Sequence, residues 1–536
     1  MVLRSRHGLA IVCLLLAQAA GLAATEPLRL GDGDRLLVLA PHPDDEILSA
    51  GGLIQEALGL DLPVRVCFLT MGDNHEIASL FTRRHPALRP GGWRPLGTLR
   101  QNEAAAAASQ LGLAPGDLVF LGYPDYGAHL IWNRHWRTVP AYRSPLTRVA
   151  AVPFARALTP GSAYAGEDIL DDLVDVIRDF QPAHLVVSHP ADHNADHRAL
   201  YLFTRIALWN LAAEGLSPEF LAAPVHFSQW PKPRLSQPDQ PATPPRELDG
   251  HHDWIEYRLA PFQVTGKLSA LRRHHSQYQS GANYLNAFIR KSELFGDFSD
   301  LILPGGTGSV QLAEDDSSQF RPDADLFQAL AGDRDEWRAI AEQNAFETAE
   351  LGGHDNDFIA RTITGDGAAL TLSFQFLKPL TPATRLVVAI FGFRADTPFG
   401  DMPKMVIDAA SDRLHSAMDL DAPLPKDAVE WQPGPPDEVT VRVPFARLGN
   451  PEKILTGAEL HKDGLPVDWV AWRAIELPGP LPSASTTPAR PATAISPAPV
   501  PAPIAAPPSA VTLRPRVHLP RPAAPERSEA TEAVIW

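Results

Sequence analysis

Residues 35–58 read RLLVLAPHPDDEILSAGGLIQEAL, and this stretch decides the fold. Its apolar run Leu36–Leu39 is typical of a buried strand, and the apolar spacing over Ile47–Leu58 predicts a helix. The turn between them concentrates one imidazole and three carboxylates within residues 42–46. A buried strand, a polar loop and a helix in this order are the building unit of an α/β protein.

The alternation of strand and helix continues downstream. Strands are predicted over Val64–Thr70, Leu118–Leu121 and His184–Ser188, and helices over Leu99–Leu111, Ile169–Phe180 and Asp196–Trp209. This order favours a Rossmann-like, mainly parallel sheet with helices on both faces. Polar residues that follow its strands then gather at the carboxyl ends of the strands, where open α/β sheets bind ligands.

Beyond a Gly-, Ser- and Asp-rich stretch at 304–317 the pattern changes. After a helical pattern over Asp323–Glu342, strands are predicted over Ala369–Leu377, Arg385–Phe393, Lys404–Ala409, Glu438–Pro444 and Val467–Leu477. We interpret this region as a mostly β accessory domain, for which a sandwich is one arrangement. Its tryptophans are expected to be core side chains rather than exposed platforms for sugar rings: Trp337, Trp431, Trp469 and Trp472.

The chain of 536 residues exceeds one ordinary domain, since domains usually contain roughly 100 to 200 residues. We predict a signal peptide at 1–24, the α/β domain at 25–310, the β-rich accessory domain at 318–477 and a disordered tail at 478–536. The tail is rich in Pro, Ala, Ser and Thr with almost no aromatic residues, so it cannot bury enough apolar surface to offset its chain entropy.

Charge and cysteine content exclude several classes of protein. The formal net charge of -16 opposes a nucleic-acid partner, because phosphate binding relies on a basic face. Of the two cysteines, Cys13 lies in the predicted signal peptide and only Cys67 remains, so no disulfide or cysteine-based zinc site is expected within the mature chain. A metal ion must therefore be held by histidines and carboxylates.

The first 24 residues have the layout of a secretory signal peptide. Arg4 and Arg6 precede the apolar run Leu9–Ala20, and small residues follow up to Ala24. The apolar run is short for a membrane span, so we expect cleavage near Ala24, a periplasmic or secreted protein, and no transmembrane span in the mature chain. An uncleaved membrane anchor is the alternative.

The polar turn after the first strand has the composition of a metal site. His42 and Asp45 can converge on one cation from this tight loop, while Asp44 points elsewhere as a base. The structural alternative is that one of these aspartates only caps the following helix. A third ligand has to come from a distant segment, and Ser188–Leu200, SHPADHNADHRAL, offers three histidines after another predicted strand.

Both loops resemble the motifs of a known enzyme family. His42-Pro43-Asp44-Asp45-Glu46 is similar to the first motif of the PIG-L or LmbE-like family, a group of zinc-dependent N-deacetylases. Asp196-His197-Arg198-Ala199 is similar to the end of its second motif, usually written H-P-D-H-R-A. The resemblance covers roughly Arg35 to Phe295.

The resemblance implies roles for individual residues. His42, Asp45 and His197 would bind Zn²⁺, and Asp44 would be the general base that acts on the metal-bound water. Arg100, in the helical pair Arg100 and Glu103, would lie near the substrate. Asp125, in the loop Gly122–Asp125, would bind a sugar hydroxyl, although an Asx turn is an equal alternative for this residue.

One position departs from the family pattern. The family often has a histidine three residues before its last zinc ligand, whereas this chain has Asn194. Asn194 can donate a hydrogen bond to a developing oxyanion but cannot donate a proton to a leaving amine. Either His193 or His189 would then have to substitute, or Asp44 would have to transfer the proton alone. His193 is also an alternative to His197 as the metal ligand.

The implied activity is hydrolysis of the acetamide of an N-acetylglucosamine-type sugar. Export favours an exported glycan or glycolipid of the cell envelope as the substrate, and the C-terminal region would bind an envelope partner. Two alternative functions are compatible with the same residues. One is a non-catalytic glycan-binding or scaffold protein on the same fold, and the other is an amide hydrolase of another acylated small molecule.

Overall fold

The computed structural model describes residues 28–73, 94–313 and 358–479, apart from short gaps inside the last two ranges. These residues belong to one compact unit, Met1–Leu481. The predicted signal peptide, the helical pattern over Asp323–Glu342 with Trp337, and nearly all of the predicted tail lie outside the described residues. Within the described part of the chain, no helix is both long and apolar enough to span a membrane.

A seven-stranded sheet forms the centre of the α/β region, in the order β3-β2-β1-β4-β5-β7-β6. Its parallel strands are β1 (Leu36–Ala40), β2 (Val64–Thr70), β3 (Leu118–Tyr123), β4 (His184–Ser188) and β5 (Glu219–Ala223). Two antiparallel strands, β7 (Ser292–Asp297) and β6 (Asp253–Arg258), extend one edge. The predicted fold class, a mainly parallel sheet in an α/β protein, is confirmed.

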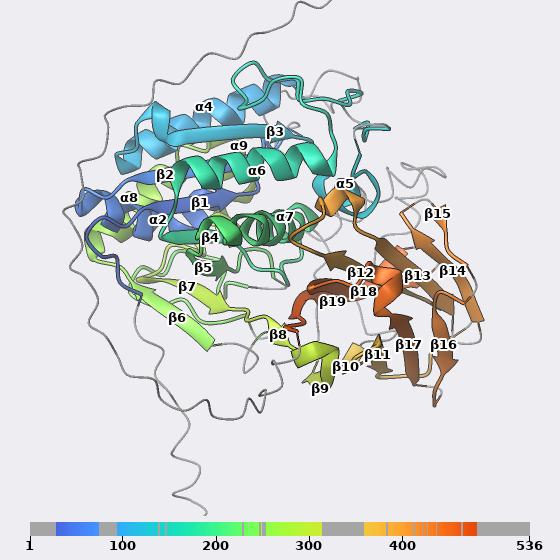
Figure 1. Ribbon diagram of the computed structural model, residues 1–536. Coiled ribbons are helices and arrows are strands. Elements are labelled where there is room, and N and C mark those ends of the chain that lie inside the picture. The colour runs from blue at the N-terminus through green and yellow to red at the C-terminus, as the bar shows by residue number, and fades with distance from the viewer. Residues whose placement is uncertain are drawn as a thin grey trace, which may run out of the picture. The chain divides into compact units, whose positions relative to one another are not determined.

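Helices cover both faces of this sheet (Figure 1). One layer contains α5 (Ala128–Arg134), α6 (Gly166–Phe180) and α7 (Ala195–Leu211), which pack against one another through α7. The other layer contains α2 (Asp45–Gly59), α4 (Arg94–Leu111) and α8 (Pro261–Leu271), and α9 (His275–Asn286) follows α8. Because both faces are covered, the central strand β1 is apolar along its whole length rather than alternating.

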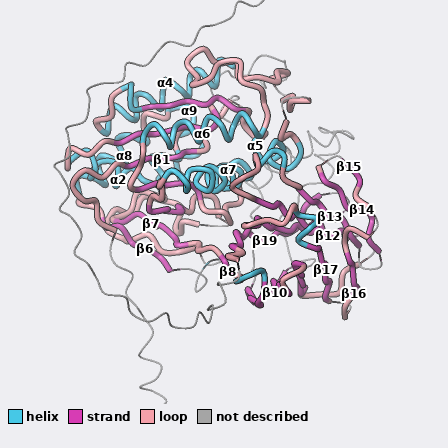
Figure 2. The backbone as a smooth tube through the Cα atoms, viewed as in Figure 1, coloured by secondary structure: helices cyan, strands magenta, loops and turns pink. Residues whose placement is uncertain are grey.

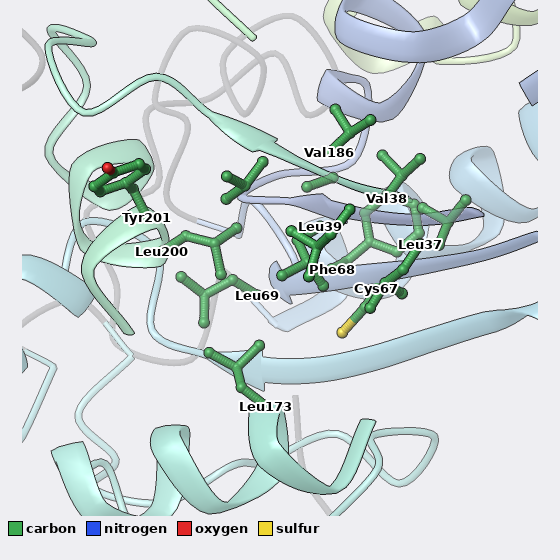
Figure 3. Packing of buried hydrophobic residues seen from close by; sticks show 14 of the residues in the cluster. Leu37, Val38, Leu39, Cys67, Phe68, Leu69, Leu173, Val186, Leu200 and Tyr201 are labelled. Carbon is green, nitrogen blue, oxygen red and sulfur yellow. The ribbon is translucent and has the colours of Figure 1, made fainter. Parts of the chain in front are cut away.

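The core lies between the sheet and these helices. All five residues of β1 are buried, and Figure 3 shows Leu37 and Leu39 among side chains of the neighbouring strands. Leu173 of α6 and Leu200 of α7 belong to the same cluster. Each such side chain contributes roughly 1.5–3 kcal/mol to stability when it is fully buried. This packing fixes the loops that leave the carboxyl ends of the strands.

Two further sheets build the accessory region, where Figure 2 shows mainly strands and the loops that join them. The five-stranded sheet has the order β16-β17-β11-β10-β9, and the seven-stranded sheet has the order β15-β14-β13-β12-β18-β19-β8. The strands of the first are β9 (Thr307–Ala313), β10 (Phe358–Asp366), β11 (Ala369–Phe376), β16 (Glu430–Pro433) and β17 (Glu438–Pro444). Those of the second are β8 (Leu301–Ile302), β12 (Thr384–Phe393), β13 (Lys404–Ala410), β14 (Arg413–Asp419), β15 (Ala422–Pro423), β18 (Lys453–Lys462) and β19 (Leu465–Glu476).

The seven-stranded accessory sheet packs on both of its faces. One face shares an apolar core with the five-stranded sheet, for example through Val388 and Leu372, so the two sheets form a sandwich. The other face contributes Phe391 and Trp472 to the core of the α/β region, where both lie against Trp132 of α5. The accessory region is therefore joined to the α/β region by a packed apolar interface.

Candidate metal centre and active site

The two polar loops meet because their strands are neighbours. β1 pairs with β4 in parallel, with Leu36 opposite His184, so both strands end at the same edge of the sheet. The loop after β1 carries His42, Asp44 and Asp45, and the loop after β4 leads to His197 in the first turn of α7. This is the edge at which open α/β sheets place their ligand sites.

Two histidines converge on one carboxylate oxygen. Asp45 Oδ2 lies 3.1 Å from His42 Nδ1 and 3.1 Å from His197 Nε2. All three side chains are buried, and their ligand atoms are close enough together to hold one metal ion. A second such group shares His42 and adds Asp125 and Asp196. Among the described residues, His193 belongs to neither group, whereas His197 belongs to the first.

The chemistry of the first group fits a metal ion. Neither ring nitrogen of His197 makes a hydrogen bond, although the side chain is fully buried. Nδ1 lies beside the carboxylate of Asp192, whereas Nε2 faces Asp45 Oδ2 at 3.1 Å. Burying a ring nitrogen without a hydrogen bond is costly, and a coordinated cation at Nε2 would give this nitrogen a partner. Two imidazole nitrogens and one carboxylate oxygen are ligands that zinc and related divalent ions accept.

The electrostatics of the group also favour a positive charge at this place. Burial lowers the pKa of His197, but the carboxylates of Asp192 and Asp45 outweigh it and raise that pKa to about 9. Burial raises the pKa of Asp45, yet the neighbouring His197 and His42 hold it well below its ordinary value. The carboxylates thus stabilise a cation between them, which a bound metal would supply in place of protons.

Three further carboxylates orient the two histidine rings. Asp192 Oδ2 lies 3.3 Å from His197 Nδ1 and accepts hydrogen bonds from two backbone N–H groups, those of residues 225 and 226. On the other ring, His42 Nε2 lies 3.2 Å from Asp125 Oδ1 and 3.4 Å from Asp196 Oδ2. Carboxylates in this position fix the orientation of a ligating imidazole and increase its basicity.

Asp44 has a strained backbone at the N-terminus of α2. Its φ of 122° is unusual for a residue with a side chain, and its own carboxylate makes no hydrogen bond to the helix. The structural reading of Asp44 as a side-chain cap therefore does not describe this residue. Its backbone N–H donates to Glu46 Oε2, and Glu46 in turn accepts from His274 Nε2 at 3.0 Å.

Arg100 contacts the loop that carries Asp44. Its guanidinium donates to the carbonyl oxygens of Gly72 and Pro43 and lies 3.5 Å from Asp44 Oδ1. Burial raises the pKa of Asp44 to about 6, and the charge of Arg100 opposes that shift. The structure thus places Arg100, predicted to lie near the substrate, beside the predicted base. Asp125 was predicted to bind a sugar hydroxyl, and one of its carboxylate oxygens lies 3.2 Å from His42 Nε2.

Asn194 is the N-cap of α7. Its Oδ1 accepts hydrogen bonds from the backbone N–H groups of Asp196 and His197, at 2.9 and 3.4 Å. Such a cap is worth roughly 1 kcal/mol and fixes the first turn of the helix. The residue that departs from the family pattern thus holds the metal ligand through its backbone.

The other two histidines of the second loop lie among aromatic rings. His189 is fully buried, with its ring near Phe298 and Trp254, and its Nδ1 accepts a hydrogen bond from the N–H of residue 191. His193 is also buried, and its ring centroid lies 5.3 Å from Phe227 and 5.4 Å from Trp469. His193 thus contacts the accessory region directly.

His226 is a site residue that the sequence reasoning missed. It follows β5, the next parallel strand after β4, and its ring centroid lies 4.6 Å from that of His197. Tyr284 stacks on this ring and places its hydroxyl 3.1 Å from Nδ1. A prediction of β5 would have located His226, because polar residues after neighbouring parallel strands reach the same edge.

A family of known proteins matches the part of the chain that contains the candidate metal centre. The model of the PIG-L family, described as GlcNAc-PI de-N-acetylase, matches residues 37–208. Residues 37–208 are a PIG-L family domain, and the enzyme class of this family is that of the deacetylases. The match includes both loops of the candidate metal centre.

Individual relatives have the same chemistry in their names. A 1D-myo-inositol 2-acetamido-2-deoxy-alpha-D-glucopyranoside deacetylase of Mycobacterium sp. (strain KMS) is 26% identical over 296 residues, 51% of this chain and 83% of that protein. A protein of the same name from Gordonia bronchialis is 30% identical over 183 residues, 33% of this chain and 58% of that protein. Among solved structures, N,N'-diacetylchitobiose deacetylase from Pyrococcus horikoshii is 17% identical with a TM-score of 0.29, over 53% of this chain and 86% of that one.

Proposed function

We propose that this protein is a zinc-dependent hydrolase that removes N-acetyl groups from an N-acetylglucosamine-type sugar. The observation that carries the proposal is the convergence of His42 and His197 on one oxygen of Asp45, with Asp44 in the adjacent turn. The PIG-L family match and the acetamido sugar in the names of the relatives support this class of substrate.

His42 Nδ1, Asp45 Oδ2 and His197 Nε2 would hold the metal ion. Two nitrogen ligands and one oxygen ligand favour zinc, and three protein ligands are the usual set of a catalytic zinc site. When bound, such an ion supplies a Lewis acid that activates water and polarises a carbonyl group. Asp192, Asp125 and Asp196 keep the two imidazoles in the orientation that this ligand set needs.

Asp44 is the proposed general base. With a pKa near 6, its carboxylate is ionised at neutral pH and can accept a proton from the attacking water. Arg100 lies against one of its oxygens and keeps the carboxylate in the charged form. The backbone of Asp44 is strained and its carboxylate makes no hydrogen bond to the helix, as expected for a group that has to meet a substrate.

The leaving amine needs a proton, which we assign to His193. Asn194 cannot supply it, and its Oδ1 serves the helix cap. His189 has no exposed surface, which argues against contact with a substrate, whereas His193 is 6% exposed. His193 lies next to Asn194 and its backbone is fixed by a hydrogen bond to the carbonyl oxygen of residue 226.

The test is acetate and amine release from N-acetylated substrates by the full zinc-loaded protein. N-acetylglucosamine, its short oligomers and an N-acetylglucosaminyl inositol are compared, with Asp44→Asn and His193→Gln as variants. We expect release from at least one of these sugars, a loss of about 10²- to 10⁴-fold in Asp44→Asn, and a smaller loss in His193→Gln. Equal rates in the wild type and Asp44→Asn would contradict the assigned base.

The capping role of Asn194 is the observation that favours a second function. A protein that has lost its proton donor but keeps the fold would bind a glycan without turnover. Zinc binding together with sugar binding and no release of acetate from any amino sugar would support this non-catalytic function. Release of another acyl group from a different small molecule would instead support the broader class of amide hydrolases.

We also propose that the protein is exported and acts on a glycan or glycolipid of the cell envelope. The basic start and short apolar run of residues 1–24 support this location, and they lie outside the described residues. N-terminal sequencing of the protein recovered outside the cytoplasm would test it. A mature chain that begins close to Thr25 is expected, whereas a full-length chain retained in the cytoplasm would contradict export.

A further inference from the structure

The accessory hairpin of β18 and β19 contacts the loops that carry the metal ligands. Glu459 of β18 is paired directly with Trp469 of β19 in an antiparallel ladder. Residues paired in this way have side chains on the same face of the sheet. Here that face is turned toward the α/β region, because Trp469 reaches His193 and Glu459 reaches His129.

The first contact leads from Trp469 to the loop after β4. The guanidinium of Arg198 lies 5.1 Å from the centre of the Trp469 ring, within the range of a cation–π interaction. Nη1 of Arg198 donates to the carbonyl oxygens of Asp192 and His193, at 2.9 and 2.8 Å. The ring of His193 meets the same Trp469 edge to face, with a centroid distance of 5.4 Å and an angle of 89°.

That loop reaches the metal ligand in one further step. The backbone of Asp192 is held by Arg198, and its carboxylate lies 3.3 Å from His197 Nδ1. Trp469 thus packs on the guanidinium whose hydrogen bonds hold the backbone of Asp192, the residue that orients the His197 ring. Trp469 is 4% exposed, so its side chain is enclosed between the accessory sheet and this loop.

The second contact leads from Glu459 to helix α5. Glu459 Oε1 lies 3.8 Å from Nε2 of His129, in the first turn of that helix. The start of α5 is tied to the metal centre through Asp196, which accepts hydrogen bonds from the N–H groups of Tyr126 and Ala128. Asp196 Oδ2 also lies 3.4 Å from His42 Nε2. The hairpin is therefore linked through neighbouring residues to both histidine ligands.

We infer that the accessory hairpin helps the α/β region to bind its metal ion, with Trp469 as a positioning residue for His197 and His193. The role of the β-rich region is then to hold the ligand loops in place, beyond any binding of partners. This inference rests on the proposed metal site but not on the identity of the substrate. It predicts that a tryptophan of the accessory region controls metal affinity without touching the metal.

The experiment measures zinc affinity of the full chain with a competing chromophoric chelator. Trp469→Leu should weaken zinc binding about threefold to tenfold, less than the roughly 10- to 100-fold typical when a direct partner of a ligand is lost. Trp469→Phe should recover most of the affinity, because Phe still offers an aromatic face to Arg198. Arg198→Lys provides an independent variant, in which the planar fork that holds both carbonyl groups is lost.

Phe374→Leu is the matched control for loss of stability. Phe374 is fully buried between the accessory sheets and belongs to the cluster on their inner side. This variant should lower the Tm but leave zinc affinity within about twofold of wild type, because the contacts of Trp469 are intact. Equal losses of zinc affinity in Phe374→Leu and Trp469→Leu would overturn the inference, as would wild-type affinity in both Trp469→Leu and Arg198→Lys.

The zinc measurement separates this inference from the proposed activity. Selective weakening in Trp469→Leu without any deacetylation in the wild type would support the positioning role and contradict the proposed reaction. Deacetylation by the wild type with unchanged zinc affinity in Trp469→Leu and Arg198→Lys would support the reaction and contradict the positioning role.

Discussion

In the α/β region, buried charged side chains gather at the carboxyl ends of β1 and β4, whereas in the described part of the β-rich region they are few and dispersed. Between residues 358 and 479 the buried charged groups are Arg361, Lys404 and Asp468. Each of these three is paired with backbone atoms. Lys404 donates to the carbonyl oxygens of residues 399 and 402, and Asp468 accepts from the N–H of residue 358.

The partners of the buried charges distinguish the two regions. In the β-rich region a buried charge satisfies backbone groups and so fastens a loop or strand end. At the metal centre, charged and ionisable side chains face one another, as Asp45 faces both His42 and His197. Because burying charge is costly, a cluster of several mutually facing groups is where a ligand or a reaction is expected. Backbone-paired charges need only a structural explanation.

Removing a metal ligand should have the largest effect. His197→Ala leaves Asp45 and His42 as an incomplete ligand set, so we expect loss of bound zinc and a fall in kcat on the order of 10³-fold. Metal analysis of the purified variant and an acetate assay give both results. Full zinc content and a wild-type rate in this variant would contradict the claim that the buried side chains of the α/β region bind a catalytic metal ion.

Removing an orienting carboxylate should have an intermediate effect. Asp192→Asn keeps the size of the side chain but takes away the negative charge beside His197 Nδ1. Loss of such a partner typically weakens metal binding about 10- to 100-fold. A chelator competition assay measures the change. Unchanged zinc affinity would mean that Asp192 acts only as an acceptor for the backbone of residues 225 and 226.

Displacing Arg100 by a substitution at Gly72 should lower kcat by a smaller factor. Gly72 has a φ of 60°, and a Cβ at this position would lie 2.0 Å from Nη1 of Arg100. Gly72→Ala should therefore shift the guanidinium away from Asp44 and lower kcat about tenfold, with little change in zinc content. Gly116→Ala is the control, because a Cβ there meets no atom within 4 Å. Equal kcat in the two variants would contradict the role of Arg100.

Removing a backbone-paired charge should change stability but not activity. Burial lowers the pKa of Lys404 from its ordinary 10.5 to about 7. Between these values the unfolded chain binds more protons than the folded one, so Lys404 makes the free energy of unfolding rise with pH. In Lys404→Met, the increase in the free energy of unfolding between pH 7 and 10 should be smaller by ~3 kcal/mol, while kcat is unchanged. Denaturant unfolding at several pH values measures it, and an unaltered pH slope would contradict the prediction.

Much of the fold follows from local sequence patterns. β2 and β4 have the predicted bounds, because each is an apolar run ended by a polar loop. β5 was not predicted, since EFLAA begins with an exposed glutamate and lacks a clear pattern. The pairing of β6 with β7 was beyond local patterns, because two helices separate these strands in the sequence. Long-range pairing depends on burial of the whole sheet.

The sequence predicted which segments form the site, but not which side chains contact one another there. The loops that contain His42, Asp45 and His197 were found from composition and family resemblance, and the structure brings these three side chains together. The cap at Asn194 could have been predicted, because an Asn directly before a helix is a common N-cap. The contact of Trp469 with His193 joins residues far apart in the chain, so it appears only once the fold is known.

Crystallographic location of zinc by its anomalous scattering tests the central claim most directly. The account predicts one ion bound by His42 Nδ1, Asp45 Oδ2 and His197 Nε2, at roughly 2.0–2.2 Å from each atom. An ion held instead by His42, Asp125 and Asp196, or the absence of any ion at this edge of the sheet in a zinc-saturated crystal, would contradict it.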